Sequence, residues 1–346
     1  MQLNPTNYIG FILKIKIPIM KKRFLTTASS LLLFVTTFSG KPGEGGPGGM
    51  KTVSISFSGA YSLYPLTQLW ASEYNKTHPD VRFDIQSGGA GKGLTDCISG
   101  AVDVAMFSRE LTQTERAQVW SLWLCKDAIL PTVNAKNPYI NALKVRGLKK
   151  SEALGIYSDQ TITTWEGLLG TNSSTQHKIN VYTRSDASGA ADTWASFFGK
   201  KQDGIKGIGV NGDPGLADAV KKDINGIGFN SYPFIYDLKT GKKFPGIEVI
   251  PIDVNNNGTI DPEENFYDNI RIFEKAVNDG KYPSPPVRNL YFLLKAGVAP
   301  KREVVDFFNW VLTDGQKYLM QAGYVPLPSR DLQASLKKLN ALNGAK

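Results

Sequence analysis

From residue 52 onward, apolar and polar residues follow two alternating rhythms along the chain. Val53, Ile55 and Phe57 alternate with serines and end at Gly59, a period of two that is typical of a half-buried strand. Apolar residues in the next segment, 66–74, recur every three or four positions, which predicts a helix. The same order of strand and helix recurs further along, so the sequence predicts an α/β protein in which mostly parallel sheets are flanked by helices. The other predicted strands are 81–85, 102–106, 179–182, 227–229 and 247–252, and the other predicted helices lie around 94–98, 194–198 and 304–312.

The N-terminal forty residues have a different pattern. Their charged residues are all basic, and three of them, at 21–23, precede an apolar run at 31–35 and small residues at 36, 37, 39 and 40. This order predicts a secretory signal peptide over 1–40, with an uncleaved membrane anchor as the alternative, although the apolar run is short for a membrane span. Glycine and proline then dominate 41–50, which predicts a flexible tether. We therefore expect a secreted protein, periplasmic or extracellular.

The length and charge of the chain bear on the number of domains and on the kind of partner. The chain has 346 residues, which favours two domains over one compact core. Its formal net charge is +9, but five of the positive charges lie in 1–40. The rest of the chain has no block of lysine and arginine interleaved with aromatic residues, so we expect no nucleic-acid partner.

Three segments, 58–62, 87–91 and 183–190, each combine the end of a strand with small residues and the start of a helix. The first N–H groups of a helix lack backbone partners and carry partial positive charge, so they attract anions. Arg184 in the third segment can offer a planar fork of donors to a phosphate-like anion, and Asp186 can hold that fork in place. The three segments together predict a site for a small oxyanion, with Arg184 as its sole strong cation.

Six short motifs occur in order: Ala-Tyr-Ser-Leu-Tyr-Pro-Leu at 60–66, Gly-Gly-Ala-Gly at 88–91, Val-Asp-Val-Ala at 102–105, Arg-Ser-Asp-Ala-Ser-Gly at 184–189, Asn-Gly-Ile-Gly-Phe at 225–229 and Gly-Tyr-Val-Pro-Leu at 323–327. In this order and spacing, the chain resembles the substrate-binding proteins of bacterial ABC-type phosphate transporters. The resemblance implies a two-lobed type II periplasmic-binding-protein fold that closes over its ligand like a hinged trap. It also implies that a membrane permease and an ATPase are the partners, and we expect the binding protein itself to be a monomer.

The lobes implied by this resemblance are formed by separate parts of the chain. One lobe is expected to comprise 51–132 and 288–346, and the other 133–287. Two crossings, near 132–134 and 290–294, would then form the hinge.

The resemblance also implies which residues contact phosphate. Ala90 and Ala190 replace hydroxyl residues that are frequent in the family, so only their N–H groups can donate. Ser108 stands where one branch of the family has an aspartate, which accepts the proton of phosphate and disfavours sulfate. We expect phosphate as the ligand, with Asp103 or backbone carbonyls as substitute acceptors, and another tetrahedral oxyanion as the alternative. The implied contacts are Ser62, Leu63, Ala90, Ser108, Arg184, Ser188, Gly189 and Ala190, with Asp186 behind Arg184.

A separate motif at 253–264 matches the twelve-residue EF-hand calcium loop, with Gly258 at the position that needs a sharp turn. A predicted strand, 247–252, precedes it, so we expect a calcium loop inserted in the fold, with a structural role, and not a helix–loop–helix pair. An ordinary Asn/Gly-rich turn is the alternative. The predicted Ca²⁺ ligands are the side chains of Asp253, Asn255, Asn257, Asp261 and Glu264 and the carbonyl of Thr259.

An enzyme is the main rival to a binding protein. His78 and His177 are the only histidines, and both fall in predicted loops, so we predict no catalytic residues. Ser62 as the covalent nucleophile of a secreted phosphohydrolase is the alternative, although the sequence places no base beside it. A calcium-stabilised surface protein is a third possibility. Cys97 and Cys125 can form a disulfide in an exported protein or stay as two buried thiols, and the sequence leaves this open.

Overall fold

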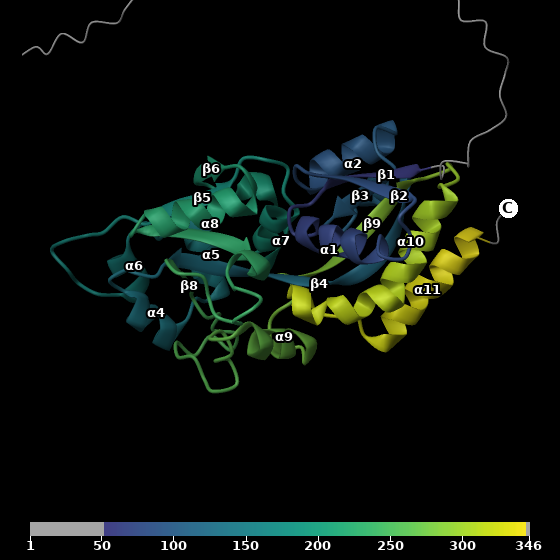
Figure 1. Ribbon diagram of the computed structural model, residues 1–346. Coiled ribbons are helices and arrows are strands. Elements are labelled where there is room, and N and C mark those ends of the chain that lie inside the picture. The colour runs from purple at the N-terminus through teal and green to yellow at the C-terminus, as the bar shows by residue number, and fades with distance from the viewer. Residues whose placement is uncertain (1–51, 344–346) are drawn as a thin grey trace, which may run out of the picture. The chain divides into compact units, whose positions relative to one another are not determined.

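The computed structural model describes residues 52–343, and the predicted signal peptide and tether lie outside the described residues. Within them, the strands form one mixed path of hydrogen-bonded neighbours with helices on its faces (Figure 1). In their order across the sheet the strands are β2 (Val81–Ser87), β1 (Val53–Gly59), β3 (Val104–Phe107), β9 (Val287–Lys295), β4 (Val119–Asn134), β7 (Gly226–Ser231), β5 (Asn180–Arg184) and β6 (Ile208–Val210), while β8 (Ile247–Val249) pairs with β4.

The first of two hydrophobic cores is built from residues near both ends of the described chain. Phe57 of β1 lies against Phe292 of β9, with ring centroids 5.3 Å apart, and Phe307 packs on both rings. Strand β1 pairs in parallel with β2 and β3, which confirms the predicted order of strand and helix in this region. The helices around this core are α1 (Tyr64–Tyr74), α2 (Ala90–Ser99), α3 (Gln113–Arg116), α10 (Arg302–Leu312) and α11 (Ser329–Asn343), with 3₁₀ turns at Asp314–Tyr318 and Met320–Ala322.

The second core is formed by the middle of the chain, drawn in teal and green in Figure 1. Trp194 is fully buried there between Tyr157 and Phe229, at ring distances of 5.3 and 6.1 Å. Strand β5 pairs in parallel with β6 and β7. The helices of this region are α4 (Ile140–Arg146), α5 (Lys150–Tyr157), α6 (Trp165–Leu169), α7 (Gly189–Phe197), α8 (Gly212–Lys222) and α9 (Ile270–Asn278), with 3₁₀ turns at Gln202–Gly204 and Tyr232–Phe234.

Strand β4 belongs to both cores. Over 119–128 it pairs with β9, and over 129–133 it pairs with β7, in both cases antiparallel. The sheets are therefore more mixed than predicted, because β4 leads the chain out of the first core and β9 leads it back in the opposite direction. The predicted lobe boundaries at 132 and 288 stay a prediction.

The ends of the parallel strands bring the predicted loops together. Gly59 ends β1 with φ +139°, and a side chain there would place its Cβ 2.1 Å from the Met106 carbonyl oxygen. Only glycine therefore allows β1 to end directly beside β3, and the N–H of Ala60 donates to that same oxygen at 2.9 Å. Because parallel strands end at one edge of a sheet, the loops after β1, β2 and β3 share an edge, as do those after β5, β6 and β7.

Candidate functional site

The first predicted loop is held from the C-terminal part of the chain. Ser62 is 1% exposed, and its carbonyl accepts a hydrogen bond from the Tyr324 hydroxyl at 2.5 Å. Its own Oγ is buried and has no partner among the described residues. The N–H of Leu63 donates to the Ala60 carbonyl at 3.1 Å. In this loop the Ser62 hydroxyl is thus unpaired among the described residues, whereas the Leu63 amide is engaged.

The second and third loops touch each other. The N–H of Gly91 in the first turn of α2 donates to the Ala187 carbonyl at 3.0 Å. A Cβ at Gly189 would lie 2.3 Å from Ser108 Oγ, so glycine at the start of α7 allows Ser108 to approach closely. Ala90, the first residue of α2, is buried beside this contact. These contacts bring the loops after β2 and β3 against the loop after β5.

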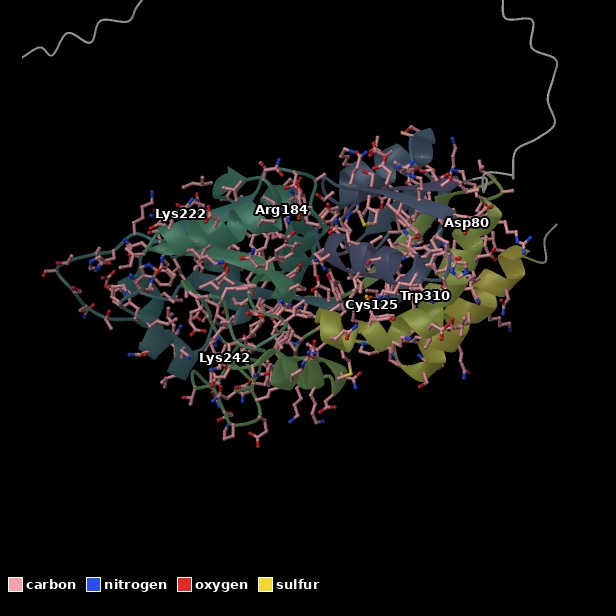
Figure 2. The ribbon with its side chains drawn as sticks, viewed as in Figure 1. Asp80, Cys125, Arg184, Lys222, Lys242 and Trp310 are labelled. Atoms are coloured by element: carbon pink, nitrogen blue, oxygen red, sulfur yellow. The ribbon has the colours of Figure 1, made fainter. Side chains whose placement is uncertain are left out.

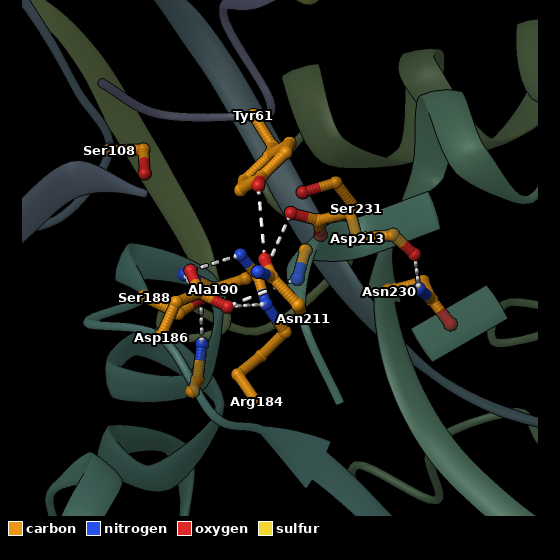
Figure 3. Close-up of polar contacts among 12 residues, drawn as sticks. Tyr61, Ser108, Arg184, Asp186, Ser188, Ala190, Asn211, Asp213, Asn230 and Ser231 are labelled. Atoms are coloured by element: carbon orange, nitrogen blue, oxygen red, sulfur yellow. Dashed lines mark hydrogen bonds and ion pairs between the residues drawn. The ribbon is translucent and has the colours of Figure 1, made fainter. Parts of the chain in front are cut away.

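Arg184 ends β5, and its side chain is 1% exposed. Its Nε and Nη2 donate to the two oxygens of Asp186 at 2.8 and 2.6 Å, and its Nη1 donates to Asp213 Oδ2 at 2.5 Å (Figure 3). Burial alone would lower the pKa of the guanidinium, but Asp213 and Asp186 raise it, and the net shift is upward. Since a guanidinium has five N–H groups, one hydrogen on each terminal nitrogen is left over by these bonds.

Ser188 caps the following helix. Its Oγ accepts from the N–H groups of Ala190 and Ala191 at 3.1 and 3.2 Å, and its own N–H donates to Gln202. The predicted Ala190 amide is therefore engaged by Ser188, whose hydroxyl hydrogen remains available as a donor.

A second buried arginine lies beside the predicted loops, so the expectation of Arg184 as the sole strong cation is wrong. Arg288 of β9 is 6% exposed, and its Nη1 donates to the carbonyl and Oγ of Ser108 at 2.8 and 3.3 Å. Its other nitrogens donate to Asp127 Oδ2 and to Ser231 Oγ. All five of its N–H groups are used in this way, so Arg288 positions Ser108 and β4 and keeps no donor for a ligand.

Asp103, an expected substitute acceptor, is engaged elsewhere. Its carboxylate accepts from the N–H and hydroxyl of Ser56 and from Lys301, all at 2.9 Å. Ser58, Lys92 and Asp96 form a similar network nearby. These groups anchor the edge of the first core.

The cysteines are free and buried in the described chain. Burial raises the pKa of the Cys97 thiol to about 11, and it raises the pKa of the Cys125 thiol further, with help from Asp127. Cys125 lies in β4, near the point where this strand passes between the cores (Figure 2). Both thiols are therefore poor nucleophiles.

The predicted calcium loop has an ordered set of oxygens. Asp253 is 1% exposed, and its two carboxylate oxygens accept the N–H groups of Asn257 and Gly258 at 3.2 and 2.8 Å. The side-chain amides of Asn255 and Asn257 both donate to Asp261 Oδ2, at 2.8 and 2.9 Å. Over 52–343, no three His, Cys, Asp or Glu side chains are gathered as a metal centre, so a cation here would also need the amide and carbonyl oxygens.

No helix within 52–343 is both long and apolar enough to cross a membrane.

Known proteins resemble this chain over most of its length. It is 24% identical over 333 residues to the phosphate-binding protein PstS of Staphylococcus aureus, covering 91% of each chain. A substrate-binding protein assigned to a phosphate ABC transporter of Clostridium perfringens, solved with bound phosphate, has a TM-score of 0.63 at 22% identity, covering 80% of this chain and all of that one. An ABC-type phosphate transport receptor from Vibrio cholerae has a TM-score of 0.57 at 23% identity, covering 79% of this chain and all of that one.

These solved structures have the two-lobed periplasmic-binding-protein fold, and the described chain has the same architecture. The family model described as the PBP superfamily domain matches residues 44–315. This chain therefore belongs to the PBP superfamily.

Proposed function

We propose that this protein captures inorganic phosphate outside the cytoplasm and delivers it to an ABC transporter. The observation that supports this most is Arg184, which is buried between the two cores and retains an N–H on each terminal nitrogen. Ser62 Oγ and the Ser188 hydroxyl add small donors from both sides. Donors of this kind, enclosed away from water, suit a tetrahedral oxyanion. Its relatives in Staphylococcus aureus and Clostridium perfringens, named for phosphate, favour that anion.

Capture fits the geometry better than hydrolysis of a phosphate ester. A serine nucleophile needs a base within hydrogen-bond reach, and Ser62 Oγ has no partner among the described residues. His78 stacks on Tyr74, and His177 bonds to Glu166, so neither histidine activates Ser62. We infer that the protein is a carrier and not an enzyme.

The partners of the protein can be inferred from the proposed capture of phosphate. A carrier of this kind hands phosphate to a membrane permease whose ATPase drives uptake, and it acts as a monomer in the periplasm or outside the cell. Tyr61 Oη donates to Asn211 Oδ1 at 3.0 Å, and the Gly91–Ala187 bond also joins the two cores. A closed arrangement of the two cores would let the permease distinguish the phosphate-bound protein from the empty one.

The direct test is calorimetry of ligand-stripped protein with phosphate, sulfate and arsenate. We expect saturable, one-to-one binding of phosphate and weaker binding of sulfate. Absence of phosphate binding at neutral pH would refute the proposed function.

We also propose that the loop 253–264 holds a structural Ca²⁺. Asp253 and Glu264 are 1% and 8% exposed, which is unusual for acids that have no salt bridge among residues 52–343. The amides of Asn255 and Asn257 meet at Asp261, and rotating each amide would present its oxygen there instead. Such hard oxygen ligands in a flexible loop suit Ca²⁺.

A further inference from the structure

Two buried aspartates beside the candidate site each have one unused oxygen. Asp127 is 0% exposed, and its Oδ2 accepts from Arg288 Nε and Nη2 and from Ser231 Oγ, at 3.0, 2.5 and 2.9 Å. Asp213 is 2% exposed, and its Oδ2 accepts from Arg184. In both carboxylates, Oδ1 is buried and has no hydrogen-bond partner among the described residues. A buried carboxylate oxygen without a donor is costly, so these atoms point to a missing donor.

The two carboxylates are linked through neighbouring residues of strand β7. Asn230 Nδ2 donates to the Asp213 carbonyl at 3.1 Å, and the next residue, Ser231, donates to Asp127. Burial raises the pKa of Asp127 despite Arg288, and the charge of Asp213 adds to this rise. The charged and titratable groups that face this pair are Arg184, Arg288, Asp186, Cys125, Tyr232 and Tyr324.

The charges of the site disfavour a dianion. Arg184 and Arg288 are surrounded by Asp127, Asp186 and Asp213, so the acids outnumber the buried cations. A monoanion that brings its own O–H donors avoids part of this repulsion and satisfies the free oxygens. Dihydrogen phosphate is such an ion, with one negative charge and two O–H groups, whereas sulfate has two charges and no proton.

We propose that the site takes phosphate as the dihydrogen monoanion, whose two O–H groups donate to Asp127 Oδ1 and Asp213 Oδ1. The inference rests on the proposed phosphate capture. These two residues then perform the selection against sulfate that Ser108 cannot. Asp186 differs from these two residues because neither of its oxygens lacks a donor: its Oδ1 accepts from Arg184 and Gly212, and its Oδ2 accepts from Arg184.

The test begins with unmodified protein. Phosphate and sulfate affinities are measured by calorimetry at pH 6, 7 and 8.5 in a constant-ionic-strength buffer. Above the second ionisation of phosphate, the monoanion becomes scarce, so we expect the apparent phosphate affinity to fall by about tenfold per pH unit. Sulfate should fail to displace phosphate at equal concentration at pH 6. A phosphate affinity that is constant or rises with pH, or equal binding of sulfate, overturns the inference, whereas no phosphate binding at any pH refutes the proposed function instead.

Variants then locate the acceptors. Asp213→Asn removes one charge and one acceptor, so the loss of phosphate affinity between pH 6 and 8.5 should shrink, and sulfate should compete better. Asp218→Asn is the matched control, because Asp218 lies on the same helix but is exposed and forms its salt bridge with Lys222. It should keep the pH dependence of the parent. An Asp213→Asn protein with the parent's pH dependence and selectivity would remove Asp213 from the proposal, and the profile of unmodified protein remains decisive if this variant does not fold.

Discussion

The ring of Tyr61 lies over the guanidinium of Arg184, with the arginine Cζ 5.1 Å from the ring centroid. Tyr61 comes from the loop after β1 and Arg184 from the end of β5, so the contact joins the two cores. A cation over an aromatic face gains from the ring quadrupole, more so when water is excluded. The arginine that we assign to anion binding is therefore also covered by the loop after β1.

Removal of the Arg184 side chain should weaken phosphate binding more than any other single change. Arg184→Ala deletes charge-assisted hydrogen bonds worth about 1.5–3 kcal/mol each, which corresponds to a loss of roughly ten- to a hundredfold in affinity or more. It also leaves Asp186 and Asp213 without their cation, so the melting temperature should drop. Calorimetry and thermal unfolding measure the two effects separately. Arg302→Ala, at an exposed position, is the control, and equal phosphate affinity in both variants would exclude Arg184 from the site.

The Tyr61–Asn211 bond should contribute to closure. Tyr61→Phe keeps the ring over Arg184 but removes the hydroxyl that bonds to Asn211, so we expect phosphate affinity to fall by about two- to tenfold. Asn211→Ala should cause a similar loss. If the two groups act only through each other, the double variant should be no weaker than either single variant. Fully additive losses in calorimetry would show that the bond does not link closure to binding.

The loops of the site could be predicted because each is a short, continuous segment. Gly59, Gly89 and Gly189 mark places where the backbone must turn or approach another segment closely, and such requirements are visible in sequence. Ser62 and Arg184 were predicted as phosphate contacts from the same motifs, and this stays a prediction. The orientation of individual backbone amides could not be predicted from these motifs. Whether the N–H of Ala190 or of Leu63 is free for a ligand depends on the local turn.

Arg288, Asp127 and Asp213 were missed for a different reason. Arg288 and Asp127 bond across 161 positions of sequence, and neither stands in a recognisable motif. The available signal was Asp127 as a lone acid at the start of the apolar run 128–131, since an unpaired acid inside a buried strand is rare. Strand β4 was missed because 127–134 is buried on both faces and so lacks the alternation of a half-buried strand.

Glu274 should make stability depend on pH. It lies in α9, 5% exposed, and burial raises its pKa from 4.5 to about 7 despite Arg271. The folded protein thus binds this proton more tightly than the unfolded chain. The free energy of unfolding therefore falls as pH rises from about 4.5 to 7, and above pH 7 it falls no further on account of Glu274. Glu274→Gln should gain about 3 kcal/mol in free energy of unfolding at pH 8.5 and almost nothing at pH 4.5.

Urea unfolding at the two pH values measures this difference. Asp84→Asn, an exposed change on β2, should show no such dependence. A Glu274→Gln variant that gains equally at both pH values would show that ionisation is not the cause.

Calcium should stabilise the fold without being needed for anion capture. A cation that binds only the folded state raises stability by mass action, so millimolar Ca²⁺ added to chelated protein should raise its melting temperature. Asp253→Ala removes the most buried ligand of the loop and should abolish this rise. Phosphate affinity should stay unchanged, because the predicted phosphate contacts lie in other loops.

The matched control lies inside the same loop. Asn256 has a left-handed backbone, with φ +62°, and it is not among the predicted ligands. Asn256→Gly suits that conformation and removes a side chain that does not bind the ion, so this variant should keep the full calcium-dependent rise. A rise that persists in Asp253→Ala would place the ion elsewhere. If the unmodified protein shows no rise at all, 253–264 is an ordinary turn held by its own hydrogen bonds, in which Asp253 and Glu264 are satisfied by backbone N–H groups alone.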